Sequence, residues 1–282
     1  FKRITDADTI CVGNFCDVVN LKPFFELFPV EYYALIRKPH ATNSDRCMSI
    51  LSGHGCPFRC NFCYRMKEGY EPREIEDIVL EIQGLRVRWG INYIDFADEL
   101  LMVGEERTRK ICEALKYQGI KWMCNGRLNY AFPSTLKAMR ESGCVFINYG
   151  IESYDDESLE KMGKKLTTEQ IKDGVENTLA EGISPGLNFI WGNIGDTKET
   201  LQKSVGFLLK YDDHAQLRTI RPVTPYPGSP LFNYAVEKGM IKDVADFYEN
   251  KHKNSDLASV QFTGLSNAEF HKCLFEANEE LL

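Results

Sequence analysis

The chain has 282 residues, of which 43% are hydrophobic and 27% charged, and this balance excludes disordered and low-complexity proteins. At roughly 100 to 200 residues per domain, the length allows one large domain, or one domain with appendages. No apolar run approaches the roughly 18 residues that a membrane-spanning helix needs. The 34 basic and 41 acidic residues give a net charge of −7, so general nucleic-acid binding is disfavoured.

The number and spacing of the cysteines indicate the cellular compartment. The ten cysteines are too few for a disulfide scaffold of this length, and three of them, Cys56, Cys60 and Cys63, stand within eight residues. This favours a cytoplasmic, thiol-reducing location. The sequence starts at Phe1 without a methionine or a signal peptide, so we expect the natural N-terminus to lie further upstream.

Short apolar runs alternate with amphipathic helical patterns along the chain, which is typical of repeated βα units. Strands are predicted in six places, at 48–52, 93–96, 121–124, 145–149, 187–191 and 216–221. Helices are predicted at 74–89, at 105–118, after Pro133, about Ser158, at 167–181 and at 197–210. Because helical segments separate the strands, we expect the strands to be parallel.

The fold class expected from this pattern is α/β, with an incomplete, open (β/α)6 TIM-like barrel. Six units in about 180 residues fall short of a closed eight-unit barrel, and a doubly wound open sheet is the alternative. The expected organisation is a linker or remnant of an upstream domain at 1–46, the partial barrel at 47–230 and a C-terminal helical extension at 231–282. In either architecture, functional groups gather beyond the carboxyl ends of the strands.

A C-x3-C-x2-C motif, Cys56, Cys60 and Cys63, follows the first predicted strand directly. Three thiolates can hold three irons of a cubane 4Fe-4S cluster, which leaves one iron open for another ligand. The alternative is a structural zinc site with His54 or Cys47 as a fourth ligand. Structural zinc sites usually pair two separated ligand couples, and the sequence has no second C-x2-C or H-x3-5-H group, so the spacing favours the iron–sulfur cluster.

With this motif after strand one of a parallel barrel, the sequence resembles the radical S-adenosylmethionine (radical SAM) enzymes. It is most similar to the subgroup that often carries an upstream cobalamin-binding domain. The resemblance extends over six segments in the expected order, at 52–65, 93–101, 122–130, 143–153, 186–200 and 224–232. It implies that the three cysteines bind the cluster and that the open iron chelates S-adenosylmethionine, with Phe62 against its adenine.

The resemblance also implies roles for side chains that follow later strands. The pair Asp98 and Glu99 would receive the methionyl ammonium, Arg127 its carboxylate and Glu152 other polar groups, while Asn193 would contact ribose or adenine. Each residue also has a structural alternative. Glu99 would be a solvated acid or helix N-terminal partner, Arg127 and Glu152 would pair with each other, and Asn193 would shape a turn.

Two departures from the family pattern affect the functional prediction. The segment 192–197 lacks the proline of the G-x-P-G-E-T pattern, and the cobalamin signature D-x-H-x-x-G is missing from these residues. Any cobalamin would therefore bind through a domain outside this chain. The remaining cysteines show no second cluster spacing, so auxiliary clusters are not expected.

The expected reaction is reductive cleavage of S-adenosylmethionine to methionine and a 5′-deoxyadenosyl radical that abstracts hydrogen from an unknown small-molecule or peptide substrate. A one-electron donor such as flavodoxin or ferredoxin is the expected partner, and cobalamin-dependent methyl transfer is one possible outcome. The alternative is a non-catalytic iron–sulfur electron-transfer module or a structural zinc module. No catalytic residue beyond the cofactor shell is predicted.

Overall fold

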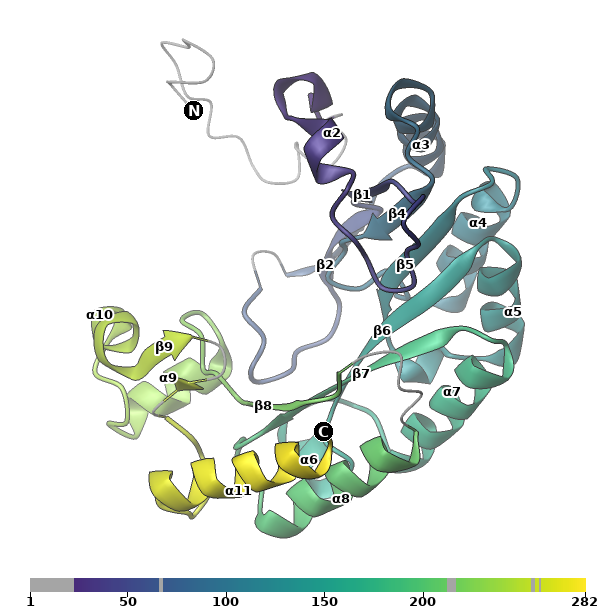
Figure 1. Ribbon diagram of the computed structural model, residues 1–282. Helices are drawn as coiled ribbons and strands as arrows, with labels where there is room; N and C mark the ends of the chain where they lie inside the picture. Colours follow the sequence, from purple (N-terminus) through teal and green to yellow (C-terminus); the bar gives the residue numbers. More distant parts are fainter. Residues whose placement is uncertain (1–22, 66–67, 212–216, 255–256, 259) are drawn as a thin grey trace, which may run out of the picture.

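The computed structural model describes residues 23–65, 68–211, 217–254, 257–258 and 260–282. Six strands form one sheet in the order β1-β4-β5-β6-β7-β8, and every neighbouring pair is parallel. The strands are β1 (Cys47–Ile50), β4 (Tyr93–Phe96), β5 (Lys121–Gly126), β6 (Cys144–Glu152), β7 (Ser184–Trp191) and β8 (Ile220–Pro222). The sheet curves into an open arc with β1 and β8 at its two edges (Figure 1). The expectation of an incomplete (β/α)6 barrel is confirmed.

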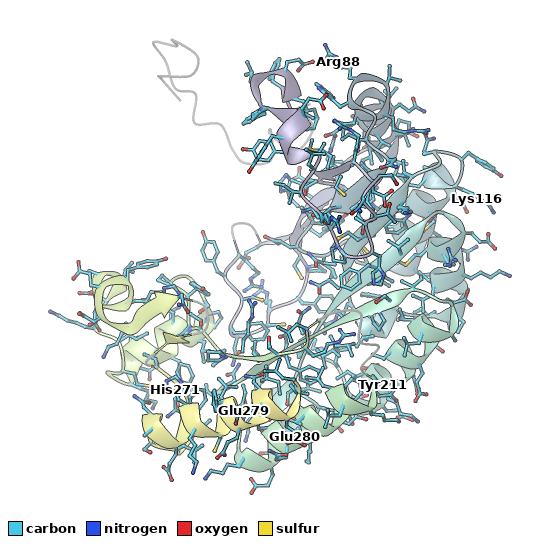
Figure 2. All side chains as sticks on the ribbon, in the orientation of Figure 1. Arg88, Lys116, Tyr211, His271, Glu279 and Glu280 are labelled. Carbon is cyan, nitrogen blue, oxygen red and sulfur yellow. The ribbon has the colours of Figure 1, made fainter. Side chains whose placement is uncertain are left out.

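Helices cover the outer face of the arc, and the core lies between them and the sheet (Figure 1). They are α3 (Ile75–Trp89), α4 (Glu105–Leu115), α5 (Pro133–Glu141), α6 (Asp156–Lys161), α7 (Thr168–Ala180) and α8 (Lys198–Lys210). Local signals set their ends: α3 stops at Gly90, whose φ of 64° is left-handed, and Thr167 and Gln170 form a capping box at the start of α7. Lys116, at the end of α4, projects from this outer side (Figure 2).

The strand faces differ in a way that positions the site. Along β5, burial alternates residue by residue, with Trp122 and Cys124 buried under the helices and Met123 and Asn125 half-buried on the inner face. The inner face of the open barrel is therefore accessible and carries polar side chains. The predicted sixth strand is shorter than expected, and its first residue, Gln216, lies outside the described residues.

One element was missed at the sequence level. The cysteine loop is carried by an antiparallel hairpin, β2 (Gly53–Cys56) paired with β3 (Gly69–Pro72), which stands apart from the main sheet. Gly55 has a φ of 83°, and a Cβ there would collide with the carbonyl oxygen of Gly69, so the hairpin needs glycine at this position. The hairpin projects the loop into the hollow of the arc (Figure 1).

Short helices precede the barrel, η2 (Phe25–Leu27) and α2 (Val30–Tyr33). The segment after them closes the amino-terminal end of the barrel. Lys38 Nζ pairs with Asp95 at 2.8 Å, and Tyr93 Oη donates to the carbonyl oxygen of Pro39 at 2.6 Å. The cysteine hairpin lies at the opposite, carboxyl-terminal end of the barrel.

The C-terminal part follows β8. Its elements are α9 (Pro230–Glu237), α10 (Val244–Asp246), the π-helical turn η4 (Phe247–Lys251), the short strands β9 (His252–Asn254) and β10 (Leu257–Ala258), and α11 (Asn267–Glu280). In the part of the chain that the structure describes, no helix has the length and apolar character required to cross a bilayer.

Helix α11 covers the free edge of β8. Asn278 Oδ1 accepts from the backbone N–H of Ile220 at 2.8 Å, and its Nδ2 donates to the carbonyl oxygen of Ile220 at 3.0 Å, so one side-chain amide replaces a neighbouring strand. We expect Asn278→Ala to lower the free energy of unfolding by about 1–3 kcal/mol, because buried Ile220 loses both partners. Urea unfolding measures this. Exposed Glu280, on the same helix (Figure 2), provides the control Glu280→Ala, and equal losses in both variants would contradict the edge role.

Candidate active site

A cavity of about 340 Å³ lies where the cysteine loop faces the carboxyl ends of β4, β5, β6 and β7. The loop contributes the three cysteines, and the strands contribute charged and amide side chains. Its lining residues are Cys56, Phe58, Cys60, Cys63, Tyr64, Arg65, Glu99, Leu100, Asn125, Gly126, Arg127, Asn148, Gly150, Glu152, Lys164 and Asn188. Six of the nine side chains selected from the sequence therefore face one cavity: Cys56, Cys60, Cys63, Glu99, Arg127 and Glu152.

Of the three loop thiols, Cys60 has an environment that favours the thiolate. The pKa of Cys60 is lowered to about 6 because the Cys63 thiol donates a hydrogen bond to it and because Lys164 and Arg127 place positive charge nearby. As the hydrogen-bond donor, Cys63 has a raised pKa, and burial raises the pKa of Cys56. Thiolates are the form that binds metal.

Arg127 follows β5 and is only 4% exposed. Its guanidinium lies 3.6 Å from the centre of the Phe58 ring, and its Nη2 donates to the carbonyl oxygen of Lys165 at 3.1 Å. These contacts hold a cation beside the cysteine thiols. Burial lowers the pKa of Arg127.

Glu152, at the end of β6, pairs with Lys164 at 3.0 Å, and the two side chains are 10% and 9% exposed. The alternative prediction of a pair between Glu152 and Arg127 is wrong, because Glu152 pairs with Lys164, while Arg127 lies over Phe58 and donates to the carbonyl oxygen of Lys165. Glu152 has a φ of 74°, a left-handed value that costs energy for a residue with a side chain. Lys164 was missed because it lies twelve residues further along the chain, in a turn with no motif of its own.

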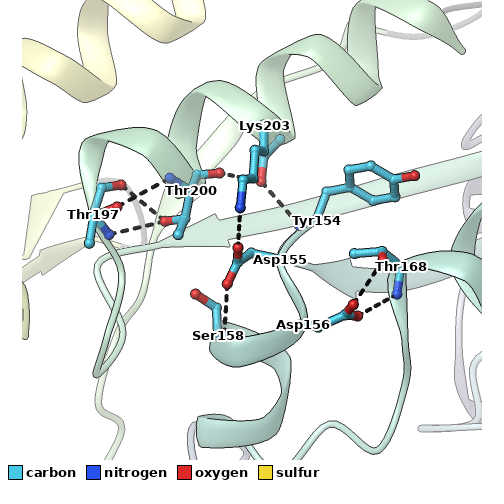
Figure 3. A network of polar contacts seen from close by, with 9 residues as sticks. Tyr154, Asp155, Asp156, Ser158, Thr168, Thr197, Thr200 and Lys203 are labelled. Atoms are coloured by element: carbon cyan, nitrogen blue, oxygen red, sulfur yellow. Dashed lines mark hydrogen bonds and ion pairs between the residues drawn. The ribbon is translucent and has the colours of Figure 1, made fainter.

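A network of polar contacts supports the turn that holds Lys164 (Figure 3). Asp155 accepts from the backbone N–H of Ser158 at 3.1 Å and from Lys203 of α8 at 2.5 Å. Asp156 accepts from the backbone N–H and hydroxyl of Thr168 at 2.7 and 3.1 Å. These bonds join the start of α6 to α7 and α8, and so fix the chain between Glu152 and Lys164.

Three asparagines form an amide ladder across the inner face, another feature missed at the sequence level. Asn188 Nδ2 donates to Asn148 at 2.7 Å, Asn148 Nδ2 to Asn125 at 3.0 Å, and Asn125 Nδ2 to the carbonyl oxygen of Asp98 at 2.7 Å. The sequence signal for this ladder was weak, because each asparagine is simply one inward-facing residue in the alternating pattern of its own strand. The ladder gives the cavity a polar wall on the sheet side.

The other three selected residues, Phe62, Asp98 and Asn193, are not part of the cavity lining. Asn193 is fully buried, and it exchanges two amide hydrogen bonds with Asn61 of the cysteine loop, at 2.9 and 3.0 Å. Phe62 lies near Lys164, whose Nζ is 5.9 Å from the ring centre. Asp98 is 1% exposed, and burial raises its pKa to about 6.

Asp98 gives the stability of the chain an unusual pH dependence. Its pKa is about 6 in the folded chain against an ordinary value of 3.8, so the folded state binds the proton more tightly. This carboxyl therefore favours folding at low pH and costs stability as the pH rises through 6, by about 3 kcal/mol in all. In urea unfolding of the metal-free chain from about pH 4 to pH 7, Asp98→Asn should gain roughly that amount relative to the wild type. A pH-independent difference would contradict the shift.

The donor set fits an iron–sulfur cluster. Three thiols of one loop line a shared cavity, and each iron of a cubane takes one thiolate. Within the described ranges, no group of three His, Cys, Asp or Glu side chains converges on a single metal-ion position. The nearby cations Arg127 and Lys164 suit an anionic cluster.

An open parallel barrel with a three-cysteine loop at its carboxyl-terminal end defines a class of cofactor-dependent enzymes. The sequence pattern of the radical SAM superfamily matches residues 50–208, which is more than half of the chain. The chain belongs to this superfamily, whose members bind a 4Fe-4S cluster and S-adenosylmethionine, and the family expectation is confirmed.

Similar proteins include methyltransferases. An uncharacterized methyltransferase of Pyrococcus horikoshii is 30% identical over 225 residues, covering 78% of this chain and 47% of the relative. The bacteriochlorophyllide d C-12(1)-methyltransferase of Chlorobaculum tepidum is 25% identical over 220 residues, covering 76% and 48%. The chain therefore spans about half the length of these relatives.

The fold is also found in a solved structure. The radical S-adenosylmethionine methyltransferase TsrM from Kitasatospora setae, with cobalamin and a [4Fe-4S] cluster bound, superposes with a TM-score of 0.69 at 17% identity. The match covers 84% of this chain and 53% of that one.

Proposed function

We propose that Cys56, Cys60 and Cys63 hold three irons of a 4Fe-4S cluster, and that S-adenosylmethionine binds in the same cavity at the fourth iron. The observation that carries this proposal is the single cavity that the three thiols share with Glu99, Arg127 and Glu152. A cavity of about 340 Å³ lies within the range of small-molecule sites.

The charged side chains offer partners for the polar groups of S-adenosylmethionine. Arg127 provides a buried cation for the carboxylate, and Glu99, which is exposed on the cavity wall, provides an acceptor for the ammonium. Glu152 is neutralised by Lys164, so it supplies a hydrogen-bond acceptor without adding net negative charge beside the cluster. The asparagine ladder provides uncharged donors and acceptors on the sheet side.

When bound and reduced, the cluster supplies the electron that cleaves S-adenosylmethionine into methionine and a 5′-deoxyadenosyl radical able to abstract hydrogen. The chain itself would bind and orient S-adenosylmethionine and exclude water from the cavity. Leu100 and the ring of Tyr64 line the cavity, and the buried ion pair and amide ladder fix the polar groups before the cofactor arrives. A flavodoxin or ferredoxin in the cytoplasm would supply the electron.

The substrate step is proposed to be methyl transfer, with cobalamin bound by a part of the protein outside these residues. Support comes from the similarity to two methyltransferases and from their greater length, since this chain spans about half of each. In this organisation, residues 47–230 form the catalytic barrel, 231–282 its extension, and 1–46 the connection to an upstream domain.

Anaerobic reconstitution with iron and sulfide, followed by dithionite and S-adenosylmethionine, tests the proposal by chromatography. We expect 5′-deoxyadenosine and methionine, and neither product without dithionite. A full cluster that yields no 5′-deoxyadenosine would contradict the proposal, and an EPR signal unaffected by S-adenosylmethionine would then indicate an electron carrier. Zinc in place of iron would indicate a structural site.

A further inference from the structure

The connection between β1 and β2 is enclosed by polar groups. Ser52 is fully buried, and its backbone N–H donates to both carboxylate oxygens of Asp98, at 3.1 and 3.0 Å. The Ser52 hydroxyl donates to Asp98 Oδ1 at 2.9 Å. Asp98 follows β4 and does not line the cavity, and its carboxylate accepts from Ser52, the residue directly before the first strand of the hairpin.

The second strand of the hairpin is held at the same place. Arg73 follows β3, and its backbone N–H donates to the carbonyl oxygen of Ser52 at 2.9 Å, while its Nη1 donates to that of Leu51 at 2.6 Å. Its Nη2 pairs with Glu81 of α3 at 2.7 Å, with both side chains nearly inaccessible at 4% and 3% exposure. From α4, Arg107 Nη2 donates to the carbonyl oxygens of Ser52 and Arg73 at 3.0 and 2.7 Å.

We infer that Ser52, Arg73, Asp98 and Arg107 form a base clamp that positions the cysteine hairpin over the barrel, with Asp98 as its central positioning residue. The inference rests on the proposed function. This positioning role differs from the expectation that Asp98 contacts the methionyl ammonium. Both carboxylate oxygens accept hydrogen bonds from Ser52, and Asp98 is only 1% exposed.

The clamp matters because the thiols and their charged partners belong to different elements. The cysteines stand on the hairpin, whose strands pair from Gly53 with Pro72 to Cys56 with Gly69. Glu152 is the last residue of β6 in the main sheet, and Arg127 directly follows β5. A tilt at the base of the hairpin would move the thiols relative to these charges, and the base clamp joins that base to Asp98 after β4 and to Arg107 of α4.

The clamp is also tied to the cavity wall. The carbonyl oxygen of Asp98 accepts from Asn125 Nδ2 at 2.7 Å, the first bond of the amide ladder. Burying a carboxylate costs free energy, and hydrogen bonds from the backbone and hydroxyl of Ser52 offset that cost here. In Asp98→Asn, an amide N–H₂ replaces one acceptor oxygen and faces a donor, so the clamp loosens without a change in volume.

The test uses the full chain with its cluster, comparing wild type, Asp98→Asn and the control Asp45→Asn. The Asp45 side chain is 4% exposed and also accepts a backbone N–H, from Thr42 at 2.7 Å, but it precedes β1 at the opposite end of the barrel. One readout is the rate of iron loss to a chelator. We expect that rate to rise about 10-fold in Asp98→Asn and to stay near the wild-type value in Asp45→Asn.

A second readout separates positioning from direct contact. Binding of S-adenosylmethionine and of its analogue without the α-amino group is measured by EPR titration of the reduced cluster. The clamp predicts that Asp98→Asn weakens both by the same factor. Weakening confined to the ligand with the amino group would show direct contact and overturn the inference, as would wild-type iron retention in a folded Asp98→Asn chain.

Hydrogen exchange of the metal-free chain provides a readout that does not depend on the cluster. We expect faster exchange of the hairpin amides of β2 and β3 in Asp98→Asn, and unchanged exchange of the same amides in Asp45→Asn. If Asp98→Asn does not fold, Ser52→Ala, which removes only the hydroxyl, should show a smaller effect in the same direction. Unchanged exchange in both clamp variants would overturn the clamp, whereas zinc in the wild type would overturn only the proposed function.

Discussion

Replacing Cys60 with serine is expected to abolish reductive cleavage of S-adenosylmethionine, with 5′-deoxyadenosine formation lowered by more than about 100-fold. Cys60 is 5% exposed, and its pKa of about 6 makes it the most acidic of the three loop thiols. A serine hydroxyl stays protonated at neutral pH and is a poor iron ligand. The iron content per chain and the product yield after anaerobic reconstitution measure the effect.

Cys273→Ser is the matched control, because Cys273 is a half-buried free cysteine on α11, outside the cavity lining. It should keep the iron content and the product yield of the wild type. Equal iron content in the Cys60→Ser chain would show that the cluster is held by other residues.

Replacing Lys164 with methionine is expected to have the largest effect on stability, lowering the free energy of unfolding by about 3–5 kcal/mol. Lys164 and Glu152 are 9% and 10% exposed, so removing one partner leaves the other charge buried without compensation. Urea unfolding of the metal-free chain at neutral pH gives the value. Because Lys164 also lowers the pKa of Cys60, the variant should retain the cluster less well.

Two further variants separate the buried pair from ordinary surface pairing. Lys161 pairs with Glu157 at 2.6 Å, but these side chains are 41% and 75% exposed, so Lys161→Met should leave the free energy of unfolding close to the wild-type value. In the double variant Lys164→Met with Glu152→Gln, most of the lost stability should return, since no charge remains buried. A loss in the double variant as large as in Lys164→Met would contradict this account.

The fold could be predicted from the sequence because its signals are local. Short apolar strands, amphipathic helices and the repeated alternation of the two predict a parallel barrel. The antiparallel hairpin β2–β3 escaped prediction because it contains three glycines and a cysteine motif instead of an alternating pattern. The hydrogen bonds at its base come from residues far apart in the sequence, such as Ser52 and Arg107, which no local window contains.

The site was predicted in part, and the division has a physical reason. Residues next to the ends of strands, such as Arg127 and Glu152, could be placed at the correct rim because parallel strands end at one edge. The sequence could not predict which of two adjacent residues faces the cavity. Asp98 is buried against Ser52, while its neighbour Glu99 lines the cavity. Lys164 and the asparagine ladder depend on contacts between separate βα units.

The most direct test of the central claim is electron–nuclear double resonance on the dithionite-reduced, reconstituted chain with S-adenosylmethionine labelled with ¹⁵N at its amino group. We predict a nitrogen coupling of a directly bound ligand, present in the wild type and lost with the cluster in Cys60→Ser. A reduced 4Fe-4S signal that shows no coupling to the labelled nitrogen would mean that the fourth iron does not bind the cofactor, and would contradict the assignment of this cavity.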